Sequence, residues 1–429
     1  MGISEVLKGE FDFWDVFCEK RWGYSIFFTL SKVKERKEGF ISGVGVRKVK
    51  GDFVDFVSLE PENAFKFLEE NNFFFDFKIH EDFFYPDFEK FLFKLDSQLR
   101  EKGKDKIENI EMSFSVSSGD FGIFSDISRV RFSRKKALFN INVFTEKNGE
   151  KESFHEFVFS EKVDDRFFKK AEEKAFYALK IAEELLDAKF SPQGVYPVII
   201  SPEAGGTFIH EVIGHSLEAD AVRKGISPVY SGKIGKKVAS EKVTVIDDPT
   251  IKGKFGSFKY DDEGVPAQKV VLIEKGILKD YLYDRKEALF ARRKSNGHGR
   301  RQAYDFAPIP RMGITFLDKG ESTAEEIFKK VKKGIFVKKM GGGQVNPANG
   351  DFVFEVQEGY LIENGKIGHL LKKATLLGNG PEILKRINHI GGEVGWADGV
   401  CGKSGQGVPV SDGMPLTLIP EIVIGGRGE

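Results

Sequence analysis

The chain has 429 residues, 40% of them hydrophobic, and its 66 Lys and Arg residues balance its 66 Asp and Glu residues. A formal charge of zero gives no reason to expect nucleic acid or an anionic membrane as a partner. The length exceeds what one hydrophobic core usually spans, so we expect two domains.

Cysteine content and hydropathy bear on the compartment. The two cysteines, Cys18 and Cys401, are too few for a disulfide scaffold, although they could form one bridge. Residues 1–10 have no apolar core of signal-peptide length, and no stretch approaches the ~20 apolar residues that span a bilayer. We therefore expect a soluble, cytoplasmic protein in a reducing compartment.

Amino-acid usage changes near residue 190. Of 42 Phe residues, 32 precede residue 191, whereas 36 of 47 Gly residues follow residue 190. The change falls at the turn-forming run Ser191-Pro192-Gln193-Gly194. We predict a Phe-rich α+β domain over residues 1–190 and a second domain over 191–429. The Phe clusters at 73–75 and 83–84 are interpreted as core filler, with a binding surface as the alternative.

The first half combines strand and helix patterns. Strands are predicted at residues 25–30, 40–49 and 52–59, helices at 61–71 and 88–99, a hairpin of 130–145 with the strand after Asn148-Gly149, and a long amphipathic helix at 164–188. This order predicts an α/β domain with a mixed sheet and helices.

The second half has many short apolar runs between Gly turns. After a strand at 195–201, we expect a turn at 203–206 and a helix that Thr207 caps. Hairpins are predicted from 270–274 with 278–283, and from 352–358 with 360–363. We therefore expect a mostly antiparallel β domain with one metal-bearing helix, and an α+β class for the whole chain.

The helix after Gly206 contains His210-Glu211-Val212-Ile213-Gly214-His215. The familiar zinc-peptidase motif has two residues between the His-Glu pair and the second His, whereas this chain has three. Positions i and i+5 lie ~140° apart on a regular helix, so two such imidazoles do not easily bind one ion. Gly214 can let the helix widen by one residue, which predicts a π-like turn. The alternative is an ordinary helix with two polar histidines.

Metal chemistry suggests a role for each residue. His210 and His215 would bind zinc, and Glu211 would accept the proton of the attacking water. A catalytic site needs a third protein ligand. Cys401, in a glycine-rich turn, is one candidate, and Glu218 and Asp220 compete with it. A buried free Cys401 is the other interpretation.

These and further motifs resemble the TldD/PmbA family, once called modulators of DNA gyrase, and its catalytic TldD branch in particular. The motifs are His-Glu-Val-Ile-Gly-His at 210–215, Leu217-Glu218, Asp261-Asp262-Glu263-Gly264, Leu272-Ile273-Glu274-Lys275-Gly276, Gly299-Arg300-Arg301-Gln302, Pro310-Arg311-Met312, Gly341-Gly342-Gly343-Gln344-Val345 and Val400-Cys401-Gly402-Lys403. They occur in order between about residues 195 and 425. The first half has no matching motif.

The resemblance implies a zinc peptidase with ligands His210, His215 and Cys401 and with Glu211 as the catalytic residue. It also implies a substrate of peptides or unfolded protein segments. A dimer is expected, either of identical chains or with an inactive PmbA-like paralogue. The alternative function is a non-enzymatic modulator that acts on a larger partner such as DNA gyrase. A weaker alternative is a zinc hydrolase acting on a different amide.

Four residues near the shared motifs are candidates for substrate binding: His298, Arg300, Arg301 and Tyr304. His298 could stabilise the oxyanion, and the other three could contact the carbonyl or carboxylate groups of a substrate. For His298, the alternative is a position in a solvated loop. For the other three residues, it is surface or structural pairing.

Overall fold

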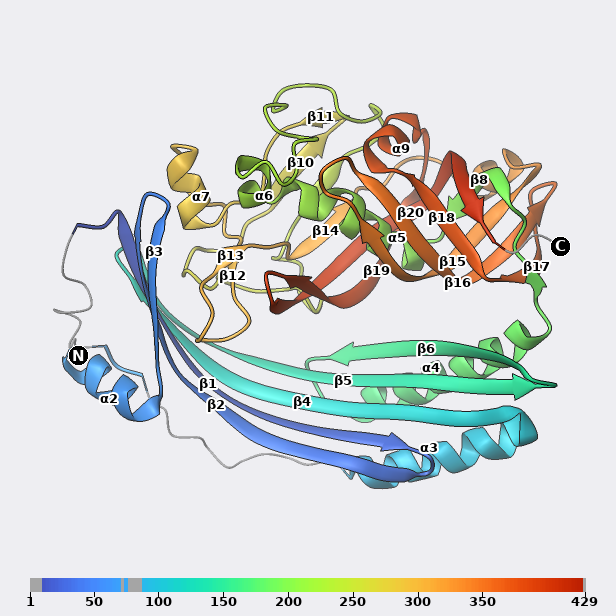
Figure 1. The fold of residues 1–429 in the computed structure, drawn as a ribbon, viewed down its shortest axis with the longest axis horizontal. Helices are drawn as coiled ribbons and strands as arrows, with labels where there is room; N and C mark the ends of the chain where they lie inside the picture. Colours follow the sequence, from blue (N-terminus) through green and yellow to red (C-terminus); the bar gives the residue numbers. More distant parts are fainter. Residues whose placement is uncertain (1–9, 71–72, 76–86, 427–429) are drawn as a thin grey trace. The chain divides into compact units, whose positions relative to one another are not determined.

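A computed structural model describes residues 10–70, 73–75 and 87–426. The chain forms two compact units (Figure 1). Unit 1 contains Met1–Asp187 with Asp262–Gly264 and Arg301–Ala307, and unit 2 contains Ala188–Asp261, Val265–Arg300 and Pro308–Glu429. The domain boundary at residue 190 stays a prediction.

Over the described residues, unit 1 has one sheet with the strand order β3-β2-β1-β4-β5-β6. Its strands are β1 (Phe13–Thr29), β2 (Lys32–Lys50), β3 (Phe53–Leu59), β4 (Ile107–Ser125), β5 (Arg129–Lys147) and β6 (Glu150–Ser160). The predicted mixed sheet is wrong, since all of these strand pairs are antiparallel. The reason is that most neighbouring strands are joined by short turns. Asn148 and Gly149, for example, have φ values of 55° and 85°, which suit a two-residue hairpin turn.

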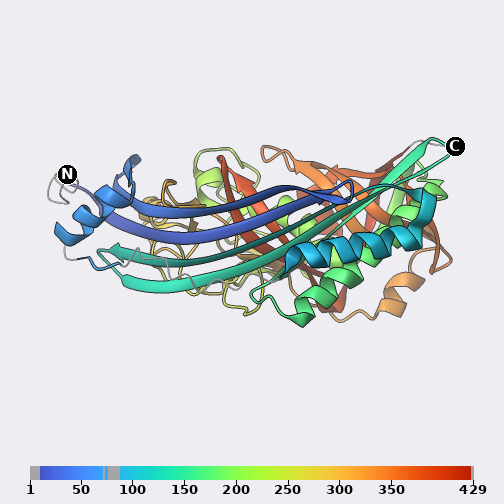
Figure 2. The ribbon, with the colours of Figure 1, turned by 90° about the horizontal axis from the view of Figure 1, so that it is seen from below.

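The helices of unit 1 are α2 (Pro61–Glu70), α3 (Phe88–Gly103), the short η1 (Lys104–Lys106) and α4 (Asp165–Leu186). Figure 2 shows α3 and α4 side by side across one face of the sheet. The predicted spacing in α4 is confirmed, because Ala171, Ala175 and Ala182 are buried. The Asp164 carboxylate caps α4 by accepting a 3.1 Å hydrogen bond from the Phe167 N–H.

Phenylalanine fills much of the core of unit 1. The ring of Phe114 has its centroid 4.7 Å from that of Phe88 and 4.9 Å from that of Phe139. Phe73 and Phe75 are buried whereas Phe74 is exposed, so the core interpretation holds for two of these three residues. Residues 83–84 lie outside the described residues.

Unit 2 has a larger sheet that follows the order β11-β10-β9-β14-β20-β8-β15-β16-β17-β7 in its described part, with β18 and β19 attached to β20. Its strands are β7 (Lys189–Phe190), β8 (Gly194–Ile200), β9 (Val245–Asp247), β10 (Val270–Glu274), β11 (Ile277–Leu278), β14 (Ile314–Leu317), β15 (Lys333–Val345), β16 (Asp351–Glu363), β17 (Lys366–Lys372), β18 (Ala374–Asn379), β19 (His389–Lys403) and β20 (Gln406–Gly425). A separate pair joins β12 (Gly299–Arg300) to β13 (Ile309–Pro310). Most strand pairs are antiparallel, and β14–β20, β15–β8 and β17–β7 are parallel.

The helical segments of unit 2 are α5 (Pro202–Ile209), η2 (His210–Gly214), η3 (His215–Leu217), α6 (Ala219–Arg223), α7 (Arg285–Phe290), α8 (Ala324–Lys329) and α9 (Gly380–Arg386). The α+β class is confirmed. The second predicted hairpin is wrong, because residues 352–363 lie in the single strand β16. The turn at Asn364-Gly365 instead joins β16 to β17.

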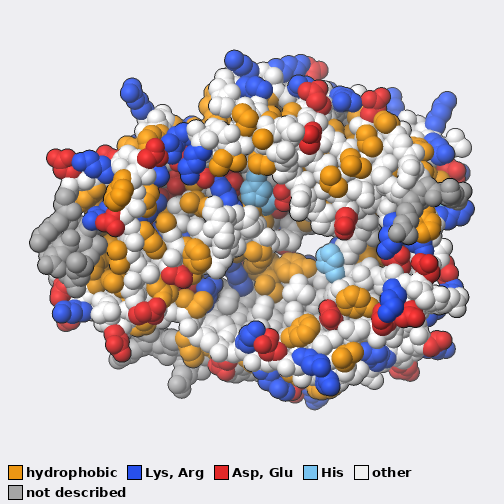
Figure 3. All heavy atoms as spheres, in the orientation of Figure 1, with side chains coloured by type: hydrophobic (Ala, Val, Ile, Leu, Met, Phe, Trp, Pro, Cys, Tyr) orange, Lys and Arg blue, Asp and Glu red, His pale blue; other side chains and the backbone are white. Residues whose placement is uncertain are grey.

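The described residues contain no helix that is long and apolar enough to cross a membrane. On the face that Figure 3 shows, Lys and Arg side chains are interspersed with Asp and Glu side chains. Both Cys18 and Cys401 are free thiols. The disulfide bond that the sequence permitted between them is therefore absent.

Candidate metal centre

Helix α5 leads into the candidate centre and begins earlier than predicted. Ser201 caps it, with its hydroxyl accepting a 3.1 Å hydrogen bond from the Ala204 N–H, and Pro202 occupies the first turn. The turn predicted at 203–206 and the cap predicted at Thr207 are therefore wrong. The Gly205-Gly206 pair that suggested a turn permits close packing instead, since a Cβ on Gly206 would lie 2.5 Å from the Asp412 carbonyl oxygen on β20.

The predicted widening of the helix is confirmed. Residues His210–Gly214 form a π-helical turn, η2, in which the His215 N–H bonds to the His210 carbonyl oxygen five residues earlier. Gly214 itself has ordinary helical angles, with φ −53° and ψ −59°. Its importance is steric, because a Cβ there would lie 1.8 Å from the Met312 sulfur. The glycine therefore lets Met312 pack against the widened turn.

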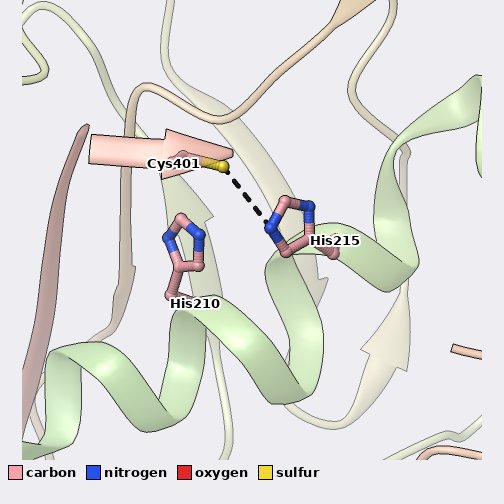
Figure 4. A group of neighbouring side chains, drawn as sticks. All are labelled: His210, His215 and Cys401. Carbon is pink, nitrogen blue, oxygen red and sulfur yellow. Dashed lines mark hydrogen bonds between the residues drawn. The ribbon is translucent and has the colours of Figure 1, made fainter. Parts of the chain in front are cut away.

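This turn brings two imidazoles to one side, where a thiol from β19 meets them (Figure 4). Ligand atoms of His210, His215 and Cys401 all lie within 4.8 Å of one another. The His215 Nε2 is 3.4 Å from the Cys401 Sγ, and the two imidazole planes are nearly perpendicular, at 89°. The three predicted ligands therefore converge on one point, although Cys401 is 186 residues from His215 in the sequence.

Each imidazole is held from behind by a carboxylate. The Asp412 Oδ1 lies 2.9 Å from His210 Nδ1, and the Glu218 Oε2 lies 3.0 Å from His215 Nδ1. A carboxylate on one ring nitrogen fixes the ring orientation and leaves the other nitrogen for a metal. Glu218 therefore supports His215 from the side away from Cys401.

The pKa values of all three candidate ligands are shifted by their surroundings. Burial raises the pKa of the Cys401 thiol, but hydrogen bonds with His210 and His215 lower it to about 5. Burial lowers the pKa of His215, while Glu218 and Cys401 raise it to about 10. Burial likewise opposes protonation of His210, yet Asp412 and Cys401 raise its pKa well above the ordinary value. Cys401 is thus a thiolate at neutral pH, the form that binds metals.

The two alternative third ligands have other partners. Glu218 bonds to His215 and also lies 3.0 Å from the Lys403 Nζ. Asp220 accepts a 2.6 Å hydrogen bond from the same Nζ. Burial raises the pKa of Glu218, but Lys403 and His215 lower it to about 2. Neither carboxylate joins the converging group, which consists of His210, His215 and Cys401 within the described chain.

The four predicted substrate-binding residues have hydrogen-bond partners of their own. His298 is fully buried, with Nε2 3.0 Å from Asp247 Oδ1 and Nδ1 2.9 Å from the Asn296 carbonyl oxygen, so the solvated-loop alternative is wrong. Arg300 is also buried and donates a 2.5 Å bond to the Met312 carbonyl oxygen.

Arg301 and Tyr304 belong to unit 1. Arg301 donates a 2.7 Å hydrogen bond to Asp15, and the Tyr304 hydroxyl donates a 2.9 Å bond to Glu60. These contacts match the structural pairing that was the alternative for both residues. Substrate binding by any of the four stays a prediction.

Sequence reasoning missed three residues that support the centre: Asp412, Arg311 and Lys403. Asp412 is 202 residues from His210, so no spacing could have linked them. Arg311 is fully buried and donates to the Cys401 carbonyl oxygen at 2.5 Å and to the Gln406 carbonyl oxygen at 3.3 Å, which ties the two strands of the β19–β20 hairpin together. Arg311 and Lys403 do lie in the family motifs noted above, and those motifs could have indicated that both residues belong to the centre.

Comparison with known proteins agrees with this geometry. A family model described as the PmbA/TldA metallopeptidase C-terminal domain matches residues 193–426, and one described as PmbA/TldA metallopeptidase domain 1 matches residues 14–71. The first half thus carries a family signal that its motifs did not reveal.

Among the curated relatives, a metalloprotease TldD homolog from Buchnera aphidicola subsp. Acyrthosiphon pisum is 40% identical over 322 residues, covering 72% of this chain and 65% of the relative. Another from the subspecies Schizaphis graminum is 32% identical over 459 residues, covering 96% of this chain and 94% of the relative. A zinc metalloprotease TldD homolog from Saccharolobus solfataricus is 36% identical over 234 residues, which cover 54% of this chain and 52% of the relative.

Solved structures share the fold at low sequence identity. TldE from Thermococcus kodakarensis matches with a TM-score of 0.71 and 19% identity, covering 95% of this chain and 97% of that one. A Thermotoga maritima protein named for modulation of a DNA gyrase matches with a TM-score of 0.74 and 20% identity, covering 96% of each chain. The two family models and the near full-length TldD homolog show that the chain belongs to the PmbA/TldD family of metallopeptidases.

Proposed function

We propose that this chain hydrolyses peptide bonds with a zinc ion bound by His210, His215 and Cys401. The observation that carries the proposal is the convergence of two imidazoles and a low-pKa thiol within 4.8 Å, each imidazole backed by a carboxylate. Nitrogen and thiolate donors suit zinc, and three protein ligands leave one coordination position open.

The donor set fits zinc because its metal-facing atoms face one another. Both Nδ1 atoms are engaged by Asp412 and Glu218, so Nε2 of each ring is the atom available to a metal. A zinc ion bound there would polarise a peptide carbonyl and lower the pKa of a water molecule. The chain itself holds the three ligand side chains in place before any metal arrives.

Glu211 is the proposed proton carrier. It lies in η2 next to His210 and is partly exposed, unlike the buried carboxylates Asp412 and Glu218. Its carboxylate would accept a proton from the attacking water and pass it to the leaving amine nitrogen. A carboxylate that must meet both water and substrate has to remain accessible, as Glu211 does.

The substrate class and the partner are also proposals. We propose peptides or unfolded protein segments as substrates. The fold shared with TldE supports assembly with an inactive paralogue of that kind, and a dimer of identical chains is the other outcome. Size-exclusion chromatography with light scattering, of the chain alone and mixed with such a paralogue, distinguishes the two assemblies.

The test combines metal analysis with hydrolysis of an unfolded protein. We expect about one zinc ion per chain in the parent, and a loss of zinc binding in Cys401→Ser. Glu211→Gln should keep the zinc and lose activity by roughly 10²- to 10⁴-fold. Glu203→Gln, a matched change in the neighbouring helix α5, should retain parental activity. A Glu211→Gln variant that cleaves as fast as the parent would refute the mechanism. A parent that binds no zinc and cleaves nothing would favour the non-enzymatic alternative.

A further inference from the structure

The Lys403 side chain lies behind the candidate metal centre, on the strand that provides the thiol. We propose that Lys403 is a positioning residue that fixes Glu218, and through it the His215 imidazole, relative to Cys401. The inference rests on the proposed zinc site and adds a residue that controls its metal affinity. It concerns the arrangement of the ligands, since Lys403 itself would not touch the metal.

Lys403 makes three short contacts at its Nζ atom. The distances are 2.6 Å to Asp220 Oδ1, 3.0 Å to Glu218 Oε2 and 3.1 Å to the Pro310 carbonyl oxygen. An ammonium group has three N–H donors, and each therefore has an acceptor here. The side chain is only 16% exposed, so these contacts hold it in one place.

The same carboxylate oxygen of Glu218 contacts both Lys403 and His215. Its Oε2 lies 3.0 Å from the Lys403 Nζ and 3.0 Å from the His215 Nδ1. Its other oxygen, Oε1, is buried and has no hydrogen-bond partner among the described residues. The position of this carboxylate therefore depends on the two contacts at Oε2, one of which is to the Lys403 ammonium.

The two carboxylates behind the imidazoles differ in how their backbones are held. Asp412 lies within β20 and pairs with Thr315 of β14 on one side and Ala397 of β19 on the other. Glu218 lies between η3 and α6, at the residue where the helical path breaks, with φ −73° and ψ 124°. The Glu218 backbone is held by a bridge to Leu282, but the glutamate side chain has one more rotatable bond than the aspartate. The position of the Glu218 carboxylate therefore depends more on side-chain contacts such as that with Lys403.

Lys403 also comes from the strand that carries the third ligand. Cys401 and Lys403 are two residues apart in β19 and pair regularly with Val408 and Gln406 of β20, so their side chains point to the same face. One strand segment thus presents the thiol to His215 Nε2 at 3.4 Å and the ammonium to the carboxylate on His215 Nδ1. Any shift of this segment would move both contacts to the imidazole together.

The test measures zinc affinity by competition with a chromophoric chelator in parent and Lys403→Met, which keeps the apolar stem and removes the charge. We expect zinc binding to weaken by roughly 10- to 100-fold, as for other groups that orient metal ligands. The matched control is Lys338→Met, because Lys338 also pairs, at 3.0 Å, with a buried glutamate, Glu358, that holds no metal ligand. The control should stay within about twofold of the parent, and equal affinities for parent and Lys403→Met would overturn the inference.

A double-mutant cycle shows whether Lys403 acts through Glu218. If it does, Lys403→Met combined with Glu218→Gln should weaken zinc binding little more than Glu218→Gln does, because both changes remove the same support. The visible spectrum of the cobalt-substituted protein should change in the same way in both single variants. Fully additive losses of affinity would show that Lys403 acts by another route.

Two further measurements keep the test decisive. Should Lys403→Met not fold, Lys403→Arg replaces it, since a planar guanidinium cannot reproduce the three contacts of the ammonium. Parental zinc affinity in Lys403→Arg would then overturn the inference. A parent that binds no zinc, or a Cys401→Ser variant that binds it like the parent, would instead refute the proposed function.

Discussion

Two buried clusters of charged side chains, one in each unit, use their charges in different ways. In unit 1, Asp15 accepts 2.7 Å hydrogen bonds from the Arg47 Nε and from the Arg301 Nη2, and Arg47 also pairs with Glu263. All four side chains are buried. In unit 2, the buried His210, the partly exposed His215 and the buried Cys401 stand with the carboxylates Asp412 and Glu218 behind them.

The two clusters differ in whether they leave atoms available to bind a metal. In unit 1, burial raises the pKa of Asp15, but Arg47 and Arg301 lower it overall, and guanidinium groups stay charged at all working pH values. That cluster is an internally paired network. In unit 2, the supporting bonds occupy the outer ring nitrogens, while the inner nitrogens and the thiol face one another. Burial of charge is therefore no mark of a functional site by itself, and it is the convergence of supported ligand atoms that makes the unit 2 cluster a candidate metal centre.

The largest predicted effect is the pH dependence of zinc affinity at the cluster in unit 2. Zinc must displace the protons that the raised pKa values of His210 and His215 keep on the imidazoles, whereas Cys401, with a pKa of about 5, has already lost its proton. Zinc affinity should therefore fall as the pH falls from 8 to 6, by up to about 100-fold per pH unit for two protons displaced. Calorimetry in buffers of different ionisation enthalpy measures the number of protons released. Affinity that is independent of pH over this range would contradict the protonated metal-free state.

The ionic network of unit 1 should affect stability and leave metal binding unchanged. Arg47→Met leaves Asp15 and Glu263 buried with less positive charge, so we expect a loss of about 3–5 kcal/mol in the free energy of unfolding. Urea titration measures it. Lys385→Met, which breaks an exposed pair with Glu382, should cost less than about 1 kcal/mol. A marked fall in zinc affinity in Arg47→Met would show that the two clusters are not independent.

The π-turn should tolerate a methyl group on its last residue poorly. Gly214→Ala places a Cβ 1.8 Å from the Met312 sulfur, so we expect a loss of about 1–3 kcal/mol in stability together with weaker zinc binding, because the turn begins at His210 and leads directly into His215. Gly342→Ala, where nothing lies within 4 Å of the new Cβ, is the matched control. Adding Met312→Ala to Gly214→Ala should restore part of the zinc affinity, and no recovery would argue against the steric explanation.

The smallest predicted effect concerns Tyr304. Tyr304→Phe removes the hydroxyl that donates to Glu60 within unit 1, so we expect a loss of about 0.5–1.5 kcal/mol in stability and an unchanged KM. Thermal unfolding and steady-state kinetics measure the two quantities. A raised KM with unchanged stability would instead support the substrate contact predicted from the sequence.

Much of the local structure could be predicted from the chain. The helices at α3 and α4, the Asn148-Gly149 turn and the strand after Gly194 follow from periodicity and turn chemistry. The start of α5 could not, because Gly205 and Gly206 are usual in turns but serve here as a close-packing surface against β20. Strand β4 (Ile107–Ser125) was missed, since its alternation of Ser with apolar residues gave a weaker signal than the Phe-rich runs.

The sequence by itself determined two candidate metal ligands, a candidate proton carrier and the widened turn, because a His-Glu pair with a second His five residues on permits few local geometries that bind a metal. The third candidate ligand, Cys401, was favoured by the family resemblance. Only the tertiary structure decided which residues support each imidazole. Asp412 reaches His210 across 202 residues, and Lys403 reaches Glu218 across nearly as many. Such contacts depend on how strands pair, and the spacing of residues along a chain carries no information about that.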